Sequence, residues 1–342
     1  MAGQQKGKLI IVGLLAAGFG ILALGFMFSA SDSKMKPNRP VNFPRLPGDT
    51  ALATLKGISL GRTLFQDPGL SADRRISCAS CHQNEHAYAD PGVAFSRGSG
   101  TVHAARNTPA LMNLQWKKSY FGDARAQHLS QTVLNAIKSP VEMASSIPAV
   151  LARLNQSDGY KKQFKKVFGT EDITEEKLKK VLVDYLQTLV TSNSRYDLYS
   201  RKESLDYTQE EHKGLMIFRQ KCNPCHAGEL FTDESLRNTG TGTTADQGLG
   251  QLTKKPEDMG KFKVPSLRNI ALTAPYMHDG RFNTLTEVLD HYSNGLNNNK
   301  GLDSTLYKQG KAGIPLSNEE KKELIRFLYT LTDAQFIRQG NY

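Results

Sequence analysis

The pattern of hydrophobic and polar residues predicts a chain built mainly from helices. In DITEEKLKKVLVDYLQTLV, residues 172–190, hydrophobic side chains recur at helical spacing and would share one face. LSNEEKKELIRFLYTL, near the end of the chain, repeats this pattern after a capping box of Ser317 and Glu320. A second capping box, Thr208 with Glu211, predicts another helix. No long alternation of hydrophobic and polar residues, the pattern of a half-buried strand, stands out.

The first 50 residues differ from the rest of the chain. Residues 9–28 are uncharged and long enough to cross a bilayer, and two lysines before them favour export of the remainder of the chain. We expect residues 1–30 to be an uncleaved transmembrane anchor. A cleaved signal peptide is the alternative, although Phe28 is bulky for the position before a cleavage site. The prolines of residues 31–50 predict an extended tether.

The chain after residue 50 contains two copies of one pattern. RNTPALMNL is followed, eleven residues past its Pro109, by YFGDAR. VPSLRNI is followed, eleven residues past its Pro265, by YMHDGR. A double match at equal spacing indicates two copies of one domain. We therefore expect an N-terminal domain in residues 51–200 and a C-terminal domain in residues 201–342.

All four cysteines belong to two CxxCH motifs. The motifs consist of Cys78, Cys81 and His82, and of Cys222, Cys225 and His226. A redox dithiol needs one pair and no histidine. Paired zinc motifs usually lie roughly 12 to 20 residues apart, whereas Cys222 comes 141 positions after Cys81. A c-type haem explains both motifs, because two thiols add to the haem vinyl groups and the adjacent imidazole binds iron. The sequence thus predicts two covalently attached haem c groups, with a dithiol or zinc site as the alternative.

Composition adds little to this interpretation. The formal net charge is +11, and lysine and arginine are spread along the chain, as on a solvated basic surface. Attraction to an acidic partner or to anionic lipid is the alternative. No basic run with interleaved aromatic residues is present, so we expect no nucleic-acid partner.

These motifs together resemble those of the bacterial diheme cytochrome c peroxidases and their MauG-like relatives. The resemblance covers roughly residues 50–335 and rests on the two CxxCH motifs, RNTPAL, SPVEM, VPSLRN and APYMHDGR. It implies a mainly α fold with two tandem cytochrome c-like domains, each binding one haem c. The haem at His82 would be the peroxidatic site, and the haem at His226 would receive electrons from a donor.

The resemblance also implies roles for two residues that face the haems. Glu142, in SPVEMA, matches the catalytic acid–base of the family, and a carboxylate near an open iron face can move the proton that peroxide cleavage requires. A glutamine of the family corresponds by spacing to Thr132, beside Gln131. Tyr292 takes the position of the second iron ligand of the C-terminal haem, where most of these peroxidases carry methionine. The alternative ligands are His291, Met277 and Met259.

Two positions depart from the family pattern. Ser99 stands where many members carry a histidine that blocks the peroxidatic iron, and His103 is four residues away. We therefore expect a site that is open without reductive activation. Gly122 stands at the position of a bridging tryptophan, and the single tryptophan, Trp116, comes six residues earlier. Tyr120 or Phe121 could then lie between the haems.

The resemblance further implies a Ca²⁺ ion between the domains. Its ligands would be the Asn107 side chain and the backbone carbonyls of Thr273 and Pro275, and such oxygen ligands suit Ca²⁺. The alternative is that Asn107 and Pro275 are plain turn residues.

The expected function is reduction of hydrogen peroxide to water in the periplasm by a cytochrome-c peroxidase-type oxidoreductase. Electrons would come from a small cytochrome c, a cupredoxin or membrane quinol and enter at the C-terminal haem. The alternatives are a MauG-like diheme oxidase acting on a partner protein and a non-catalytic electron-transfer cytochrome. Since family members are often dimers, a homodimer is one expected assembly.

Overall fold

The computed structural model describes residues 34–35, 39–46, 53–296, 301–308 and 310–338. Residues 9–28, the expected membrane anchor, lie outside this part. None of the helices in the part described is both long and apolar enough to span a bilayer. Helices predominate and the strands are two or three residues long, so the prediction of a mainly α fold is confirmed.

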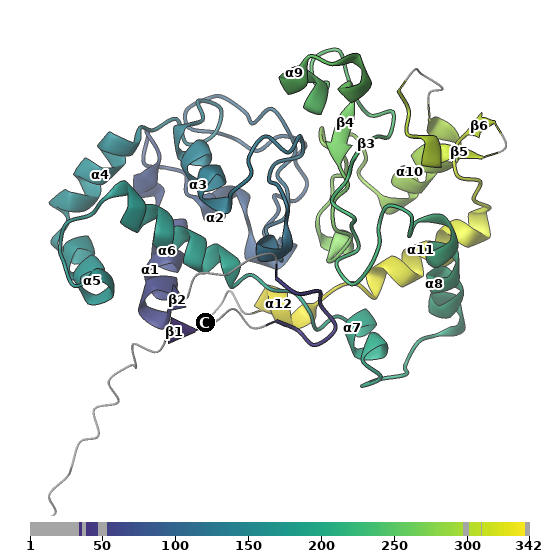
Figure 1. Cartoon of the computed structure of the whole chain (residues 1–342), viewed down its shortest axis with the longest axis horizontal. Coiled ribbons are helices and arrows are strands. Elements are labelled where there is room, and N and C mark those ends of the chain that lie inside the picture. Colours follow the sequence, from purple (N-terminus) through teal and green to yellow (C-terminus); the bar gives the residue numbers. More distant parts are fainter. Residues whose placement is uncertain (1–33, 36–38, 47–52, 297–300, 309, 339–342) are drawn as a thin grey trace, which may run out of the picture. The chain divides into compact units, whose positions relative to one another are not determined.

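The first half of the folded body packs its helices around one hydrophobic core (Figure 1). Its elements are β1 (Lys34–Met35), which pairs with β2 (Ala53–Thr54), α1 (Leu55–Phe65), α2 (Cys78–Cys81), α3 (Leu129–Lys138), α4 (Ile147–Gln156), α5 (Asp158–Phe168) and α6 (Glu175–Gln187). Short 3₁₀ turns lie at Pro68–Leu70, Asn84–His86 and Leu114–Trp116. The core runs from Leu60 to Leu189 and also includes Phe336.

The second half has a smaller core of its own, drawn from Leu215 to Leu331. Its elements are α7 (Arg195–Ser200), α8 (Gln209–Lys221), β3 (Leu236–Asn238), α9 (Leu249–Thr253), β4 (Lys261–Lys263), α10 (Leu285–Asp290), β5 (Tyr307–Lys308), β6 (Lys311–Ala312), α11 (Asn318–Tyr329) and α12 (Ala334–Arg338). β3 pairs with β4 and β5 with β6, all antiparallel. Turns lie at Pro256–Asp258, Ile270–Leu272, His291–Gly295 and Ser304–Leu306. α12 returns to the first half, where Phe336 packs on Tyr88 with ring centroids 5.7 Å apart.

Each half contains one close crossing of two helices. α1 crosses α6 at Gly61, where a Cβ atom would lie 1.9 Å from the carbonyl oxygen of Val181. α8 crosses α11 at Gly214, where a Cβ atom would lie 2.0 Å from the carbonyl oxygen of Glu323. Only glycine lets the backbones approach this closely. The same device in both halves shows that the sequence repeat is also a structural repeat.

The loops repeat as well, at the spacing of 156 residues that separates Pro109 from Pro265. The backbone N–H of Tyr120 donates to Ala126 O at 2.8 Å, and that of Tyr276 donates to Phe282 O at 2.7 Å. The 3₁₀ turns Leu114–Trp116 and Ile270–Leu272 are related by the same spacing. The prediction of two copies of one unit therefore extends to the irregular segments.

Part of the expected tether belongs to the folded body. Phe43 is 2% exposed and packs edge-on against Trp116 with centroids 5.1 Å apart. The indole Nε1 of Trp116 donates to Pro44 O at 3.0 Å, and the Asn42 amide donates to Glu229 Oε2 at 3.2 Å. Residues 39–46 are thus docked, because Phe43 supplies a hydrophobic contact that proline content alone did not reveal.

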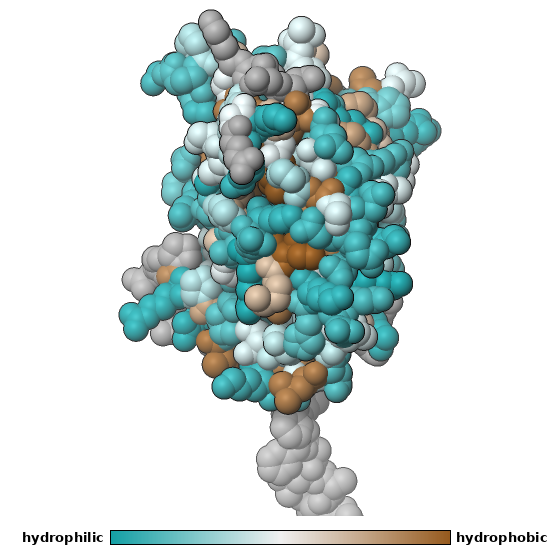
Figure 2. All heavy atoms as spheres, turned by 90° about the vertical axis from the view of Figure 1, so that its right-hand side faces the viewer, coloured by the Kyte–Doolittle hydropathy of each residue, from teal (hydrophilic) through white to brown (hydrophobic). Residues whose placement is uncertain are grey.

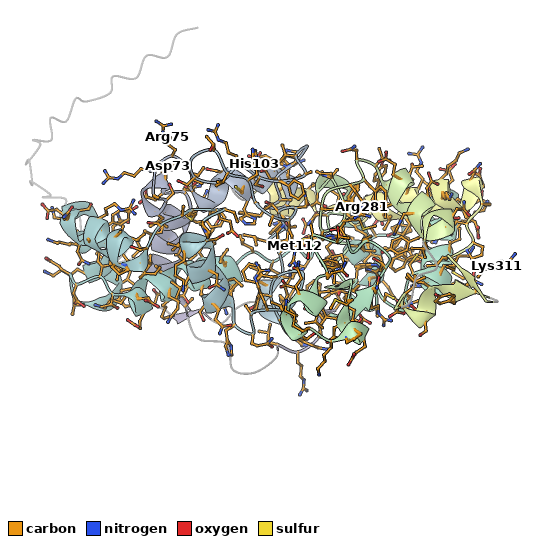
Figure 3. The ribbon with its side chains drawn as sticks, turned by 90° about the horizontal axis from the view of Figure 1, so that it is seen from above. Asp73, Arg75, His103, Met112, Arg281 and Lys311 are labelled. Atoms are coloured by element: carbon orange, nitrogen blue, oxygen red, sulfur yellow. The ribbon has the colours of Figure 1, made fainter. Side chains whose placement is uncertain are left out.

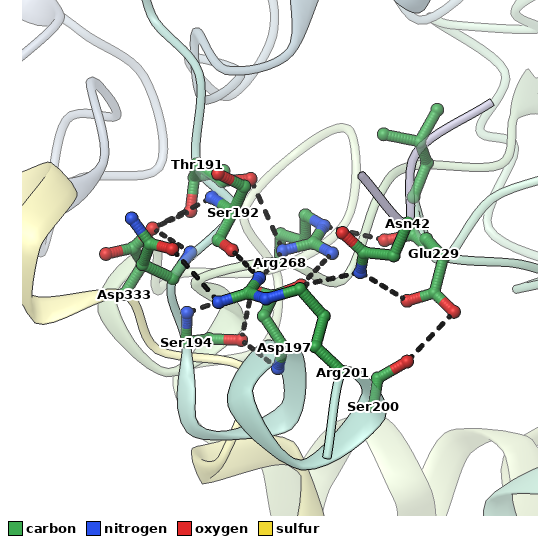
Figure 4. Close-up of polar contacts among 12 residues, drawn as sticks. Asn42, Thr191, Ser192, Ser194, Asp197, Ser200, Arg201, Glu229, Arg268 and Asp333 are labelled. Carbon is green, nitrogen blue, oxygen red and sulfur yellow. Dashed lines mark hydrogen bonds and ion pairs between the residues drawn. The ribbon is translucent and has the colours of Figure 1, made fainter. Parts of the chain in front are cut away.

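A buried polar network links segments of both halves (Figure 4). The Arg268 guanidinium donates from Nη2 to Asp197 Oδ1 at 2.7 Å and from Nη1 to Asp197 Oδ2 at 2.9 Å. Thr191 Oγ1 donates to Asp333 Oδ2 at 3.0 Å and accepts from the Asn269 amide at 3.1 Å. Because these groups are buried, each needs its hydrogen-bond partner. The network therefore holds together chain segments that are far apart in the sequence.

Candidate haem sites and active site

The first CxxCH motif is held by a single turn of helix. Cys78 and Cys81 begin and end α2, and His82 comes directly after it. The His82 Nδ1 atom lies 2.7 Å from the carbonyl oxygen of Tyr88. A carbonyl at this distance accepts the Nδ1 proton and leaves Nε2 as the atom free to bind a metal. Burial lowers the pKa of His82, which favours the neutral imidazole that coordination requires.

The second motif has the same arrangement at the end of a longer helix. Cys222 caps the C-terminus of α8, and His226 Nδ1 lies 3.1 Å from Phe231 O. Burial again lowers the pKa of His226. Burial raises the pKa of the Cys222 thiol to about 12.

Both motifs line one large cavity with a volume of about 1120 Å³. Ordinary small-molecule pockets measure roughly 300 to 1,000 Å³, so this cavity is large for a single small ligand. Its surface is mainly apolar, and leucine is the residue type that lines it most often, with members from both halves. A large apolar cavity with the two motif histidines and four thiols at its wall suits a pair of flat, hydrophobic metal cofactors.

Glu142 lines this cavity on the turn after α3. Burial raises its pKa, and the charge of Arg125 and a hydrogen bond from Ser139 offset only part of that rise. Burial raises the pKa of Cys78 to about 12, and the Glu142 carboxylate adds to this rise. Glu142 therefore lies near the first motif. A carboxyl group with a raised pKa in a partly enclosed pocket is suited to take up and release protons.

The structure separates the two candidates for the family's glutamine position. Thr132 lines the cavity, and its hydroxyl donates to Leu129 O at 2.6 Å. Gln131 is exposed, and its Oε1 accepts from the backbone N–H groups of Gln127 and His128. Gln131 therefore caps α3 and does not reach the pocket.

Neither Ser99 nor His103 lines the cavity. The Ser99 N–H donates to Glu142 O at 2.7 Å, and its hydroxyl accepts from the Asp73 N–H at 3.4 Å. His103 is exposed, and in Figure 3 it lies at the edge of the first half with Asp73. Among described residues, the histidines that line the cavity are His82, His226 and His278.

Tyr292 lines the cavity on a π-helical turn after α10. Burial raises its pKa to about 12, with further contributions from the Cys225 and Cys222 thiols, so the side chain lies close to the second motif. The alternative His291 instead places Nε2 2.9 Å from Thr239 O and does not line the cavity. Met277 lines the cavity, whereas Met259 packs against Gly250. Ala136, the repeat equivalent of Tyr292, lines the cavity and offers no ligand atom.

The three expected calcium ligands all line the cavity. The Asn107 Nδ2 atom donates to the carbonyl oxygens of Val93 and Ala94, both at 3.1 Å, so its side-chain oxygen is the atom left for a cation. Thr273 and Pro275 line the wall from the second half. In the part of the chain that is described, no cluster of three histidine, cysteine or acidic side chains offers another metal site.

An aromatic ring other than tryptophan lies beside Gly122. A Cβ atom there would meet only the Phe262 ring within 4 Å, at 3.9 Å. Phe262 stacks on His278 with centroids 4.0 Å apart and an interplanar angle of 17°. Trp116 does not line the cavity, whereas Tyr120 and Phe121 do.

Comparisons with known proteins agree with this arrangement. The family model for di-haem cytochrome c peroxidase matches residues 55–205. Methylamine utilization protein MauG of Methylorubrum extorquens is 32% identical over 303 residues, covering 87% of this chain and 84% of that protein. Cytochrome c551 peroxidase of Nitrosomonas europaea is 30% identical over 322 residues, covering 92% and 90%. The solved structure of a MauG-like protein associated with microbial copper homeostasis has a TM-score of 0.80 and 31% identity, covering 89% and 97%.

The chain belongs to the di-haem cytochrome c peroxidase family. Membership in this family implies two haem c groups, and the residues present fit them: each CxxCH motif opens onto the cavity, and each histidine has Nδ1 occupied by a backbone carbonyl. As a di-haem peroxidase homologue, the chain is an oxidoreductase of the peroxidase type.

Four cavity residues of this peroxidase homologue did not emerge from the sequence: Phe262, His278, Lys117 and Lys263. His278 is buried, and both ring nitrogens lack a hydrogen-bond partner among described residues. Lys263 is also buried, with a side chain 7% exposed. The internal repeat is the sequence signal that could have identified these four positions. At its spacing of 156 residues they correspond, in the order given, to Arg106, Gly122, Thr273 and Asn107.

Proposed function

We propose that this protein is a periplasmic peroxidase that reduces hydrogen peroxide to two molecules of water, consuming two electrons and two protons. The observation that carries the proposal is Glu142, a carboxyl group with a raised pKa in the same cavity as His82, with no histidine from the Ser99 loop beside it. Relatives named cytochrome c peroxidase support the choice of substrate.

His82 and His226 would be the proximal iron ligands, through Nε2, and the four cysteines would form the thioether bonds. The bound haems supply the redox-active iron that reacts with peroxide and carries electrons. The protein orients each imidazole through the carbonyl oxygens of Tyr88 and Phe231. Such partners typically influence metal affinity or activity 10- to 100-fold.

Glu142 would move the proton. Its carboxylate takes a proton from one peroxide oxygen and returns it to the other, which then leaves as water. Arg125 and Ser139, which also line the cavity, act on this carboxyl group and favour its ionised form. Ser99 N–H holds the turn by donating to the Glu142 carbonyl oxygen, which positions the side chain.

The site would be open in the fully oxidised protein. His103 is the nearest histidine to the missing ligand position in sequence, and it is exposed with Nδ1 3.4 Å from Phe95 O. The loop of Gly98 packs closely against the turn that carries Glu142. A Cβ atom on Gly98 would lie 2.4 Å from the carbonyl oxygen of Val141. We therefore propose activity without reductive activation.

Electrons would enter at the haem of His226, where Tyr292 would be the second iron ligand. A phenolate ligand lowers the reduction potential relative to a thioether, so a donor of low potential is favoured. The end of the second half shown in Figure 2 is mainly hydrophilic, with small separate hydrophobic areas. That surface and the net charge of +11 suit a donor with an acidic face.

The remaining features of the proposal concern setting and assembly. Ca²⁺ would bind at Asn107, Thr273 and Pro275, through oxygen ligands. Residues 9–28 would anchor the protein to the inner membrane with the folded body in the periplasm. A homodimer is the proposed assembly by analogy with the family.

Stopped-flow mixing of the fully oxidised holoprotein with hydrogen peroxide, without reductant, tests this function. We expect a rapid change in the Soret band that Glu142→Gln slows and that the exposed-site control Glu85→Gln leaves unchanged. Reaction only after one-electron reduction would contradict the open site. No reaction with peroxide in either state would contradict both enzymatic functions and would indicate an electron-transfer cytochrome.

The second candidate is a MauG-like oxidase of a partner protein. Tyr292 in the cavity and the 32% identity to a MauG protein favour it. Steady-state turnover separates the two candidates. Rapid peroxide consumption with a small electron donor supports the peroxidase, whereas fast reaction with peroxide but negligible turnover with any small donor supports the oxidase.

A further inference from the structure

A cluster of three charged side chains lies in the wall of the haem cavity and has no role in the proposed proton chemistry. It consists of Lys117 from the first half and of Glu234 and Lys263 from the second. The Lys263 Nζ atom lies 3.2 Å from Glu234 Oε2 and also donates to Ser119 O. Both side chains of this pair are more than nine-tenths buried, at 7% and 8% exposure. We call these three residues the junction cluster.

Lys117 lacks a counter-charge of its own. It is partly buried, and its ammonium group has neither a hydrogen-bond nor an ion-pair partner among the residues that the structure describes. Burial and the neighbouring Lys263 ammonium lower the pKa of Lys117 to about 8, although Glu234 opposes the shift. Two ammonium groups thus share one carboxylate, and an unpaired buried charge is costly.

Two further carboxylates of the cavity wall already have arginine partners, although the charge of Asp123 also opposes the lowering of the Lys263 pKa. Asp246 accepts from Arg106 Nε at 2.6 Å and Nη2 at 2.8 Å. Asp123 accepts from Arg106 at 2.6 Å and from Arg125 at 2.9 Å. Since these carboxylates are already matched by two guanidinium groups, the junction cluster keeps an excess of positive charge directed at the cavity.

The internal repeat gives a second, independent reason to expect an anion here. Asn107, Thr273 and Pro275, the expected calcium ligands, correspond at the spacing of 156 residues to Lys263, Lys117 and Ser119. The backbone supports this pairing, because Asn107 N–H donates to His278 O and Lys263 N–H donates to Gly122 O, both at 2.7 Å. The site that the repeat relates to the expected calcium site therefore holds two lysines, one from each half.

We propose that Lys117 and Lys263 bind a haem carboxylate, with Glu234 and Ser119 O fixing the Lys263 ammonium group. Both CxxCH motifs line the cavity that the junction cluster also lines, so a haem held by either motif would bring its carboxylates into the same cavity. Ammonium–carboxylate contacts in a partly buried site are charge-assisted and short. Lys117 and Lys263 are thus positioning residues for the cofactor. The shared haem carboxylate would also link Lys117 of the first half to Lys263 of the second half.

The electrostatic consequence is a change in reduction potential. Positive charge near a haem stabilises the reduced form, which carries one charge less than the oxidised form. Removal of the Lys117 ammonium should therefore lower the midpoint potential of the haem that it contacts. This inference depends on the haems of the proposed function but not on peroxide turnover.

The test is spectroelectrochemical titration of the full-length holoprotein, with Lys117→Met compared with Lys118→Met. Lys118 is the exposed neighbour and does not line the cavity, so it is a matched control for the loss of one lysine. We expect Lys117→Met to shift one reduction equilibrium at least tenfold toward the oxidised form, about 59 mV for a one-electron couple. Lys117→Arg should restore most of the potential, and resonance Raman should show an altered haem carboxylate band only in Lys117→Met.

Potentials of Lys117→Met equal to those of Lys118→Met would overturn the proposal. Haem content and far-UV circular dichroism establish that each variant is loaded and folded. If Lys117→Met fails to take up haem, Lys117→Gln carries the same comparison. Because no peroxide is added, a negative result is distinct from failure of the peroxidase activity, which the stopped-flow experiment measures separately.

Discussion

At the residue scale, the carboxyl group of Glu142 sets an expected pH dependence. Its pKa is raised by burial, and a general base acts only when ionised. Activity should therefore rise with pH through the raised pKa, with the acid limb above the ordinary glutamate value of about 4.3. The measurement is kcat/KM for peroxide against pH. We expect Glu142→Gln to reduce kcat/KM about 10²- to 10⁴-fold and to abolish this limb; an unchanged limb in the variant would assign it to another group.

Tyr292 is the residue that should set the potential of the second haem. Replacing phenolate by thioether in Tyr292→Met should raise the midpoint potential, because a phenolate stabilises ferric iron. Tyr292→Phe should instead leave an open coordination position with a high-spin spectrum. The control is Tyr329→Phe, since Tyr329 on α11 is 51% exposed. If Tyr292→Phe keeps the parent low-spin spectrum, the ligand is another residue, with Met277 the first alternative because it also lines the cavity.

Single residues differed in how far the sequence predicted them. The CxxCH motifs, Glu142 and Tyr292 were found because short motifs and fixed spacings carry them, and all line the cavity. Lys117 and Phe262 were missed because each lies in a stretch with no motif, and their relevance arises only when the two halves meet. Trp116, six residues before the position of the bridging tryptophan, packs against Phe43 and does not line the cavity.

At the element scale, the two glycine crossings predict a paired stability effect. Gly61→Ala and Gly214→Ala would place Cβ atoms 1.9 and 2.0 Å from carbonyl oxygens of the crossing helices. Each helix pair must then separate, at a cost of about 1–3 kcal/mol or more in the free energy of unfolding. The control is Gly159→Ala in α5, whose Cβ atom would meet its nearest neighbour at 3.6 Å, so that higher helix propensity should stabilise it slightly.

Urea denaturation of the holoproteins checks these effects. We expect the two crossing variants to unfold at lower urea concentration than the parent, with the midpoint of Gly159→Ala unchanged or higher. A midpoint of Gly61→Ala equal to the parent value would mean that α1 and α6 can separate without cost.

Elements were predictable where amphipathic spacing and capping residues agree. The helix expected from the spacing in residues 172–190 forms as α6, and those expected after Thr208 and Ser317 form as α8 and α11. Thr174, Thr208 and Ser317 each accept a hydrogen bond at the helix start. The short elements were not predicted. β3 and β4 have three residues each, and such pairs depend on tertiary packing more than on local sequence.

At the scale of the whole molecule, the two halves are joined by groups that no local pattern reveals. The Asn269 amide, in the second half, donates to Met112 Sδ of the first half at 3.5 Å, and both residues are buried. α12 belongs to the last residues described, yet Phe336 completes the core of the first half. The repeat predicted two similar units but not these connections, because they break the symmetry of the repeat.

The buried pair Asp197–Arg268 predicts how stability depends on pH. Burial alone raises the pKa of Asp197, but the Arg268 hydrogen bonds and charge, with those from Ser194, lower it overall. The unfolded value is about 3.9, so the stabilisation is fully present above that pH and is lost as the pH falls through the lowered folded pKa. Removing the guanidinium in Arg268→Leu should cost about 3–5 kcal/mol at neutral pH, because a buried carboxylate remains unpaired.

That variant should also show the reverse pH dependence. With Arg268 gone, burial would raise the pKa of Asp197, so the loss should be largest at neutral pH and shrink in acid, where the carboxyl group is protonated. The double variant Asp197→Leu/Arg268→Leu should recover part of the loss, since no charge is left buried. Urea midpoints between pH 4 and pH 8 measure all three proteins, with Lys165→Met as a control for an exposed ion pair. An Arg268→Leu deficit that stays constant with pH would show that the lost stability comes from packing against Phe43, whose ring lies 4.6 Å from the guanidinium carbon, and not from the unpaired carboxylate.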